Sequence, residues 1–291
     1  MKRSILARLH SNGLYYLMSA LLVLLAAPFY QIIILGPTGF ASALSATGSG
    51  RYTAYLVWIG THTTEFILYR TILIIAFALL ISFPFALYRI IVAQEIMGQQ
   101  ELEDEELNED DERAEGSPKD ENALAAEETG DDIAIDDGMP EYAWRGKGFA
   151  VLAAWLGLIG LSIYVLSAVT STFYFISAGN PYATGAALGA VTTFSTLFTI
   201  STNTIGTGLL GLGVLFFGAM IVRTGRNLWP DIWVNFGYAA LFVAALLCIS
   251  AIGVISAPGS GQSTLTTIAT LLFALWILWL GIMLVRLKPE A

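Results

Sequence analysis

Hydroxyl side chains inside an uncharged segment are the residues of this chain whose spacing suggests a binding surface. The segment 192–208, TTFSTLFTISTNTIGTG, is rich in Thr, holds two Ser and one Asn, and has no charged residue. On a helical wheel at 100° per residue, its Phe and Leu side chains gather on one side and its hydroxyl side chains on the other. The hydroxyl side consists of Thr192, Ser195, Thr196, Thr199, Thr202 and Asn203.

The hydroxyl side has no lysine or arginine, unlike the polar face of a typical helix lying on anionic lipid. We therefore expect these hydroxyls to meet a water-filled cavity, another helix, or the carbonyls one turn back in their own helix. The cavity interpretation predicts a path for a small solute along 192–208, and the helix interpretation predicts a packing surface.

The end of this segment supports both interpretations. Thr204-Ile205-Gly206-Thr207-Gly208 resembles the outline of the potassium-channel filter, in which backbone carbonyls replace the hydration shell of an ion. It departs from the family at Thr207, where the filter has an aromatic residue, and it lacks the acidic residue that follows. The resemblance implies that Thr204, Gly206 and Gly208 line an ion path. The alternative is that these glycines, with others further along, let helices approach closely.

A second polar group, His62, Glu65 and Arg70, lies between the first two apolar segments. His62 and Glu65 are three residues apart, which places them on one face of a helix and suits a metal site. A metal needs three or four ligands, and the only other histidine, His10, is predicted on the opposite side of the membrane. For Arg70 the favoured expectation is that its side chain extends outward to the interface, and the alternative is that it binds an anionic ligand or a lipid headgroup.

Apart from these residues, the sequence contains no set of side chains typical of a catalytic site. The sequence offers no Ser-His-Asp or Cys-His set, no phosphate-binding loop and no second carboxylate within the apolar segments for a proton relay. The single cysteine, Cys248, can form neither an internal disulfide nor a cysteine-based metal site. We expect no enzyme, no metal and no cofactor.

The elements that position these residues are apolar spans. The chain is 56% hydrophobic and only 13% charged, which predicts an all-α, multi-pass membrane protein. We expect two outer segments, 36–65 and 179–205, to form short outer or re-entrant helices. Six spans are predicted: 14–35, 66–92, 149–177, 206–222, 232–256 and 264–287.

Basic residues predict how these spans are oriented. With both termini cytoplasmic, three in–out–in hairpins place nearly every lysine and arginine on the inner side, with Arg51 and Arg70 the exceptions. This arrangement predicts a plasma-membrane protein. A seventh span at 184–203 would move four basic residues outside, so we reject it.

One acidic segment divides the chain. Of the 23 acidic residues, 20 lie between Glu95 and Glu141, and like charges at this density favour disorder. We expect a first hairpin at 1–95, a largely disordered cytoplasmic loop at 96–143, and a four-helix region at 144–291. The part at 101–141 is either a solvated loop or a docking site for a basic partner.

The sequence favours a non-enzymatic structural or interaction subunit of a membrane assembly. Its expected partners are the lipid bilayer and other membrane subunits or further copies of itself, and no nucleic acid. The alternative is a pore or carrier for a small solute or ion, lined by 192–208.

Overall fold

The computed structural model describes residues 3–46, 50–94, 141–183, 189–227, 229–256 and 264–286, and every regular element among them is a helix. Six of these helices are long and apolar enough to cross a membrane, in agreement with the number expected from the sequence. They are Leu9–Thr38, Thr63–Gln94, Gly148–Tyr182, Ala190–Thr224, Asp231–Val254 and Thr264–Arg286.

The first span is a continuous helical segment that contains two π-helical stretches. Pro28 has no N–H, and its ring pushes away the carbonyl one turn earlier, so the regular hydrogen-bond ladder cannot pass it unchanged. Wider π-helical turns are a common way to absorb such a disruption. The segments are α1 (Arg3–Leu21), η1 (Leu22–Ala26), α2 (Ala27–Tyr30), η2 (Gln31–Leu35) and the 3₁₀ turn η3 (Gly36–Thr38).

Two short helices follow, α3 (Phe40–Ser45) and α4 (Gly50–Thr61), as expected for the first outer segment. The turn into α3 is made at Gly39, whose φ of 81° is a left-handed conformation that glycine adopts at little cost. The indole Nε1 of Trp58 on α4 donates to the carbonyl of Thr38 at 3.0 Å, which holds α4 to the end of the first span.

The second span consists of α5 (Thr63–Ala78) and a helix at 83–94, joined by a tight turn at 79–82. In this turn the amides of Leu80 and Ile81 bond three residues back, at 3.1 and 3.2 Å, instead of four. Pro84 explains the break, because it cannot donate to the ladder and crowds the carbonyl of Leu80.

The hydroxyl-rich segment is part of the fourth span. Helix α7 (Glu141–Ala183) forms the third span, and α8 (Gly189–Thr199) then continues through the π-helical η4 (Ile200–Gly206) into α9 (Thr207–Thr224). The expectation of a separate outer or re-entrant helix before a span starting at 206 is therefore wrong. Without charged residues, nothing in the segment opposes its continuation as apolar helix.

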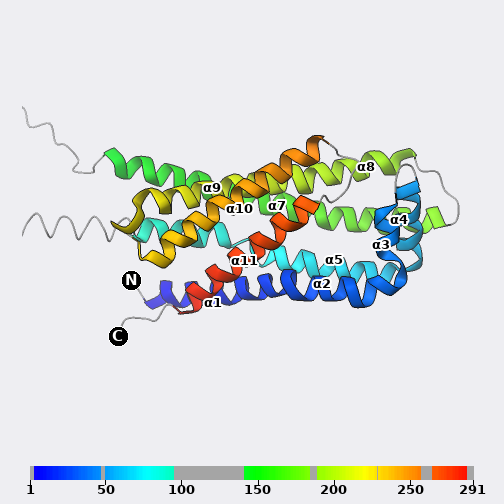
Figure 1. Cartoon of the computed structure of the whole chain (residues 1–291), viewed down its shortest axis with the longest axis horizontal. Helices are drawn as coiled ribbons and strands as arrows, with labels where there is room; N and C mark the ends of the chain where they lie inside the picture. The colour runs from blue at the N-terminus through cyan, green and yellow to red at the C-terminus, as the bar shows by residue number, and fades with distance from the viewer. Residues whose placement is uncertain are drawn as a thin grey trace, which may run out of the picture.

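The remaining helices, α10 (Asp231–Ser256) and α11 (Thr264–Arg286), complete the bundle (Figure 1). Neighbouring helices follow the order α1, α11, α10, α9, α7 and α5, and α5 packs back on the first span. Helices α10 and α11 occupy only one half of the long axis, whereas the first span, α5, α7 and α8 extend further, to the end where α3 and α4 lie. We call that end the capped end.

The opposite end is where α1 begins and α11 ends (Figure 1). The turn between α9 and α10 lies there too, so Arg223, Arg226 and Arg286 gather at this basic end. That the basic end faces the cytoplasm stays a prediction. The predicted acidic loop lies outside the described residues, apart from positions 141–143, which begin α7.

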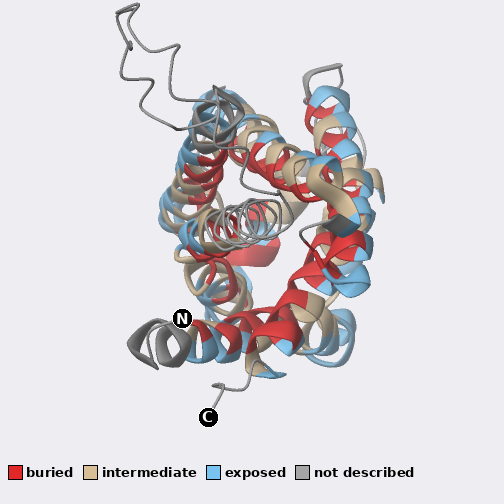
Figure 2. Cartoon of the chain, turned by 90° about the vertical axis from the view of Figure 1, so that its left-hand side faces the viewer, coloured by how far each residue is buried: buried red, intermediate tan, exposed pale blue. Residues whose placement is uncertain are grey.

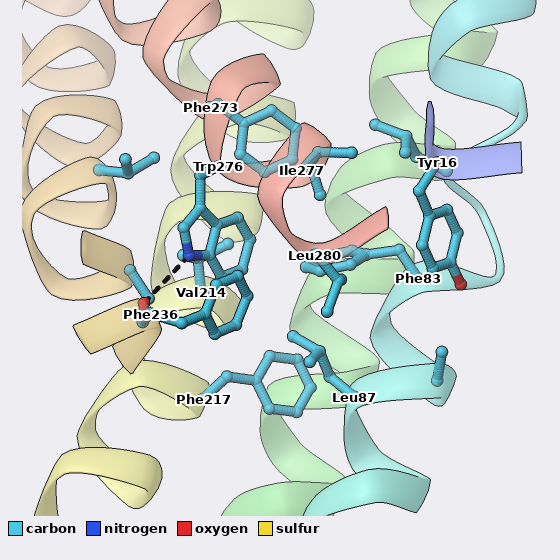
Figure 3. Close-up of a cluster of buried hydrophobic side chains, with 14 of the residues drawn as sticks. Tyr16, Phe83, Leu87, Val214, Phe217, Phe236, Phe273, Trp276, Ile277 and Leu280 are labelled. Carbon is cyan, nitrogen blue, oxygen red and sulfur yellow. Dashed lines mark hydrogen bonds between the residues drawn. The ribbon is translucent and has the colours of Figure 1, made fainter. Parts of the chain in front are cut away.

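Buried residues face the inside of the bundle and exposed ones its outer surface (Figure 2). Phe83, just after the turn in the second span, is fully buried and has edge-on ring contacts with Tyr16, Phe217 and Trp276 (Figure 3). Trp276 donates its indole N–H to the carbonyl of Phe236 at 3.2 Å. This cluster fills the half of the molecule nearer the basic end, which we call the packed half.

Candidate functional site

A cavity of about 170 Å³ lies in the other half, nearer the capped end, which we call the hollow half. Its lining comes from α5 and α7, from Gln31 of η2, and from α8 with η4. Helices α3 and α4 contribute Phe40, Leu44, Tyr52 and Tyr55. This volume exceeds several-fold the roughly 10–15 Å³ that one water needs by the same measure, so a small organic molecule fits.

Among the described residues that line the cavity, Arg70 is the one that carries a charge. Its Nε donates to Thr172 Oγ1 at 3.0 Å, and its Nη2 donates to Ser171 Oγ at 2.7 Å and to the carbonyl of Ala168 at 3.1 Å. All three acceptors are on α7. The guanidinium therefore lies across the bundle, between α5 and α7.

The direction of this side chain differs from the favoured expectation. The rings of Phe77 on α5 and Tyr164 on α7 are 4.1 Å apart, so these two residues are level in the antiparallel pair. Arg70 is two turns from Phe77, and Ser171 is two turns from Tyr164, both toward the capped end. Arg70 thus bonds to residues at its own level and does not extend outward to the interface.

The hydroxyls of Ser171 and Thr172 can only accept in their hydrogen bonds with Arg70. Ser171 and Thr172 each donate their own proton to the carbonyl of Ala168, at 3.0 and 2.7 Å. Their oxygen lone pairs then remain for the guanidinium, whose five N–H groups can only donate. The sequence interpretation missed Ser171 and Thr172. The signal was their position in the third span, at the level of Arg70 in the outer part of the second.

Charge compensation is incomplete in this arrangement. No carboxylate forms an ion pair with Arg70 in the described part of the chain, and Nη1 donates no hydrogen bond to any described residue. Arg70 is half-buried, and a positive charge that is partly removed from water without a counter-charge is unfavourable. The two Nη1 donors and the uncompensated charge are available to whatever occupies the cavity.

Two further polar side chains on the cavity wall lack partners. Ser195 is 6% exposed and Asn203 is 9% exposed, and neither side chain has a hydrogen bond to the residues that the structure describes. Their polar atoms keep some accessible surface, since among the described residues Ser19 Oγ is the one fully buried polar side-chain atom without a hydrogen-bond partner. A hydroxyl and a carboxamide facing a cavity beside a guanidinium are donors suited to an anion.

Of the other residues on the predicted hydroxyl side, two line the cavity and two do not. Thr199 and Thr202 line the cavity, and Thr202 Oγ1 also bonds Ser167 Oγ at 2.8 Å. Thr192 is exposed, and Thr196 donates to its carbonyl one turn back at 2.9 Å.

The residues of the filter-like motif are helical throughout. Thr204 and Gly206 lie in η4, and Gly208 lies in the first turn of α9. Their carbonyls point along a helix axis, so the filter conformation implied by the resemblance is wrong. Thr204 instead donates to the carbonyl of Ala251 on α10 at 3.2 Å. A Cβ on Gly206 would lie 3.2 Å from the carbonyl oxygen of Gly160 on α7, and one on Gly208 would touch Ala251.

The residues His62, Glu65 and Arg70 have different surroundings in the structure and do not form one cluster. His62 sits at the bend between α4 and α5, with its ring stacked on Trp58 at 5.2 Å and Nδ1 2.9 Å from Thr61 Oγ1. Glu65 lies in the first turn of α5, where the helix dipole favours a negative charge. Among the described residues, no three His, Cys, Asp or Glu side chains are grouped as metal ligands.

We compared the chain with models of protein families, with characterised proteins and with solved structures, and found no match.

Proposed function

We propose that this multi-pass membrane protein is a carrier whose cavity binds an anionic molecule through Arg70. The observation that carries the proposal is the combination of an uncompensated guanidinium with free Nη1 donors and two nearly buried, unpartnered side chains, Ser195 and Asn203, on one cavity. Charged groups inside membrane spans commonly mark ligand or ion pathways. Together these groups offer donors and no carboxylate, which favours an anion over a cation.

The glycine surfaces argue against the structural-subunit alternative, because helices of this chain already occupy them. A Cβ on Gly160 would lie 2.6 Å from the backbone nitrogen of Leu210, and one on Gly213 would lie 2.9 Å from the carbonyl oxygen of Ala153. Small residues are therefore used to pack α7 against α9. They leave no glycine face on α9 for a second subunit at these positions.

A carrier needs elements that can move on either side of its site, and the cavity walls supply them. The π-helical segments η2 and η4 both contribute to the cavity lining, η2 through Gln31 and η4 through Thr202 and Asn203. Segments of this kind often mark functional sites, because their hydrogen bonding can be rearranged. The packed half closes the opposite route around Phe83, so passage requires the helices to separate there.

The test is ligand-dependent stabilisation of the purified full chain in detergent. Sodium salts of phosphate, sulfate, acetate, benzoate and octyl phosphate are compared with sodium chloride at equal ionic strength. We expect saturable stabilisation by at least one anion, weakened about 30-fold or more in Arg70→Gln, since losing one partner of a desolvated charge pair costs about 2 kcal/mol or more.

The matched control is Arg223→Gln, which removes an exposed arginine at the basic end. It should leave the stabilisation unchanged. If no anion stabilises the wild type, or if both variants respond equally, the anion site does not exist. In proteoliposomes, counterflow of the stabilising anion that disappears with Arg70→Gln distinguishes a carrier from a protein that only binds.

A further inference from the structure

We infer that the anionic ligand is an amphiphile that enters the cavity sideways from the lipid, with its headgroup on Arg70 and its tail between η2 and α8. This inference rests on the proposed function, because it identifies the ligand class and the entry route of the same site.

Helices α3 and α4 cover the end of the cavity, whereas no described long helix covers its flank between η2 and α8. Helices α3 and α4 place Phe40 and Tyr55 over this end, and α4 is held against α7, where a Cβ on Gly179 would lie 3.2 Å from the backbone nitrogen of Gly60. Helix α11, which lies between α1 and α10 in the packed half, stops at mid-length (Figure 1). Its main contacts are with α1, η1 and α10, and among the described residues no long helix takes the corresponding position between η2 and α8.

Both edges of this flank are apolar and exposed. On the first span Ile32 is 69% exposed and Ile33 is 53% exposed, and on α8 Leu197 is 53% exposed. Exposed apolar side chains on a membrane span face lipid tails. Ile32 and Leu197 lie about 10 Å from the capped-end limits of their spans, at the depth of Arg70, so a molecule leaving the cavity through this flank meets the boundary between headgroups and lipid tails.

Span lengths place Arg70 near headgroup depth. The last two spans have 24 and 23 residues, about 35 Å at 1.5 Å per residue, which matches a hydrocarbon layer of about 30 Å. The third and fourth spans have 35 residues each, and the excess of about 15 Å extends toward the capped end. Arg70 is about 10 Å from the start of its span at that end, and thus close to the boundary of the hydrocarbon.

The cavity lining fits a molecule with two chemical parts. Arg70, Ser195 and Asn203 offer polar groups, while Leu73, Ile74 and Phe198 offer apolar ones. Tyr30 and Tyr69, whose rings stack at 6.5 Å, belong to an aromatic cluster of the kind found at membrane interfaces. An anionic lipid headgroup satisfies the free donors, and its tail remains in the membrane.

The experiment uses the full chain in phosphatidylcholine nanodiscs that contain a phosphatidylglycerol with a photoreactive group on its tail. We expect labelling on η2 and α8 at least threefold above that on the exposed face of α10, where Phe242 and Ile249 are 61% and 54% exposed and serve as the internal control. Arg70→Gln should lower the labelling to the α10 level. Arg223→Gln should not, and photoreactive phosphatidylcholine should label all faces equally.

The outcomes separate this inference from the proposed function. Equal labelling of η2, α8 and α10 by phosphatidylglycerol overturns sideways entry by an amphiphile. If inorganic phosphate then stabilises the wild type and not Arg70→Gln, the anion site stands and its ligand is soluble. If no anion and no lipid shows an Arg70-dependent effect, both proposals fail.

Discussion

The packed half and the hollow half are built from the same long helices but are held together differently. In the packed half the helices touch through glycine and small residues, and aromatic rings such as Phe83 and Phe217 fill the remaining space. In the hollow half, side-chain hydrogen bonds connect the same spans. Arg70 reaches from α5 to α7 by hydrogen bonds, and Ser167 reaches from α7 to Thr202.

Backbone irregularities occur in both halves. In the packed half α9, α10 and α11 are uninterrupted α-helices, but η1 and the turn at 79–82 lie in its core, and η2 and η4 interrupt the helices beside the cavity. A membrane gives helices little hydrophobic drive to associate, so close packing and interhelical hydrogen bonds must hold them. The packed half uses the first and the hollow half relies more on the second. The difference indicates where stability and ligand binding can be changed separately.

Removing Phe83 should have the largest effect on stability. Its ring is 0% exposed and contacts four other rings, so Phe83→Ala leaves a cavity and should cost about 3–5 kcal/mol in the free energy of unfolding. Phe40→Ala in the hollow half should cost less, because its ring already borders a cavity and a covering helix that can rearrange. Denaturant titration in detergent measures both. An equal cost would show that the two halves are equally well packed.

Adding a methyl group at Gly160 should have the next largest effect. The new Cβ would meet the backbone nitrogen of Leu210 in α9 at 2.6 Å and the carbonyl oxygen of Gly206 in η4 at 2.8 Å, which cannot rotate away, so Gly160→Ala should cost about 1–3 kcal/mol. Gly253→Ala is the matched control, because no atom lies within 4 Å of its Cβ position. The two unfolding free energies are compared directly. Stability unchanged by Gly160→Ala would mean that α7 and α9 are not in close contact.

The sequence predicted the packed half better than the hollow half. Hydropathy determines the number of spans, because in lipid the backbone must satisfy its own hydrogen bonds and only whole helices do so. Six spans follow from that requirement, and six are found. The start of the fourth span was wrong by 16 residues, at Ala190 instead of Gly206, because hydroxyls that bond to carbonyls or face a cavity do not end a helix.

The cavity itself depends on which helices face each other, which no single segment encodes. The wheel separates Ser195 and Asn203 from Leu197, but it does not say that Arg70, more than a hundred residues earlier, lines the same space. That proximity comes from α5 and α8 both packing beside α7. The expected outward path of Arg70 failed for the same reason, since the acceptors Ser171 and Thr172 lie on another span.

Removing one hydroxyl beside Arg70 should have the smallest effect, and it tests how the hollow half is held. Ser171→Ala deletes the shortest bond of the guanidinium, at 2.7 Å, but Thr172 Oγ1 and the carbonyl of Ala168 remain as acceptors. Interhelical hydrogen bonds in membranes contribute about 0.6 kcal/mol on average, so the unfolding free energy should fall by about that amount. The control is Ser201→Ala, whose side chain forms no hydrogen bond to the described residues.

The same variant should hardly weaken anion binding, because the Arg70 N–H that is released from Ser171 becomes a further donor facing the cavity. We expect less than a fivefold change in the anion concentration for half-maximal stabilisation, against about 30-fold or more for Arg70→Gln. If Ser171→Ala instead lowered the unfolding free energy by several kcal/mol, the Arg70 contacts would stabilise the pairing of α5 with α7 as much as the aromatic rings stabilise the packed half. Arg70 would then be a structural residue, and the distinction between the two halves would not stand.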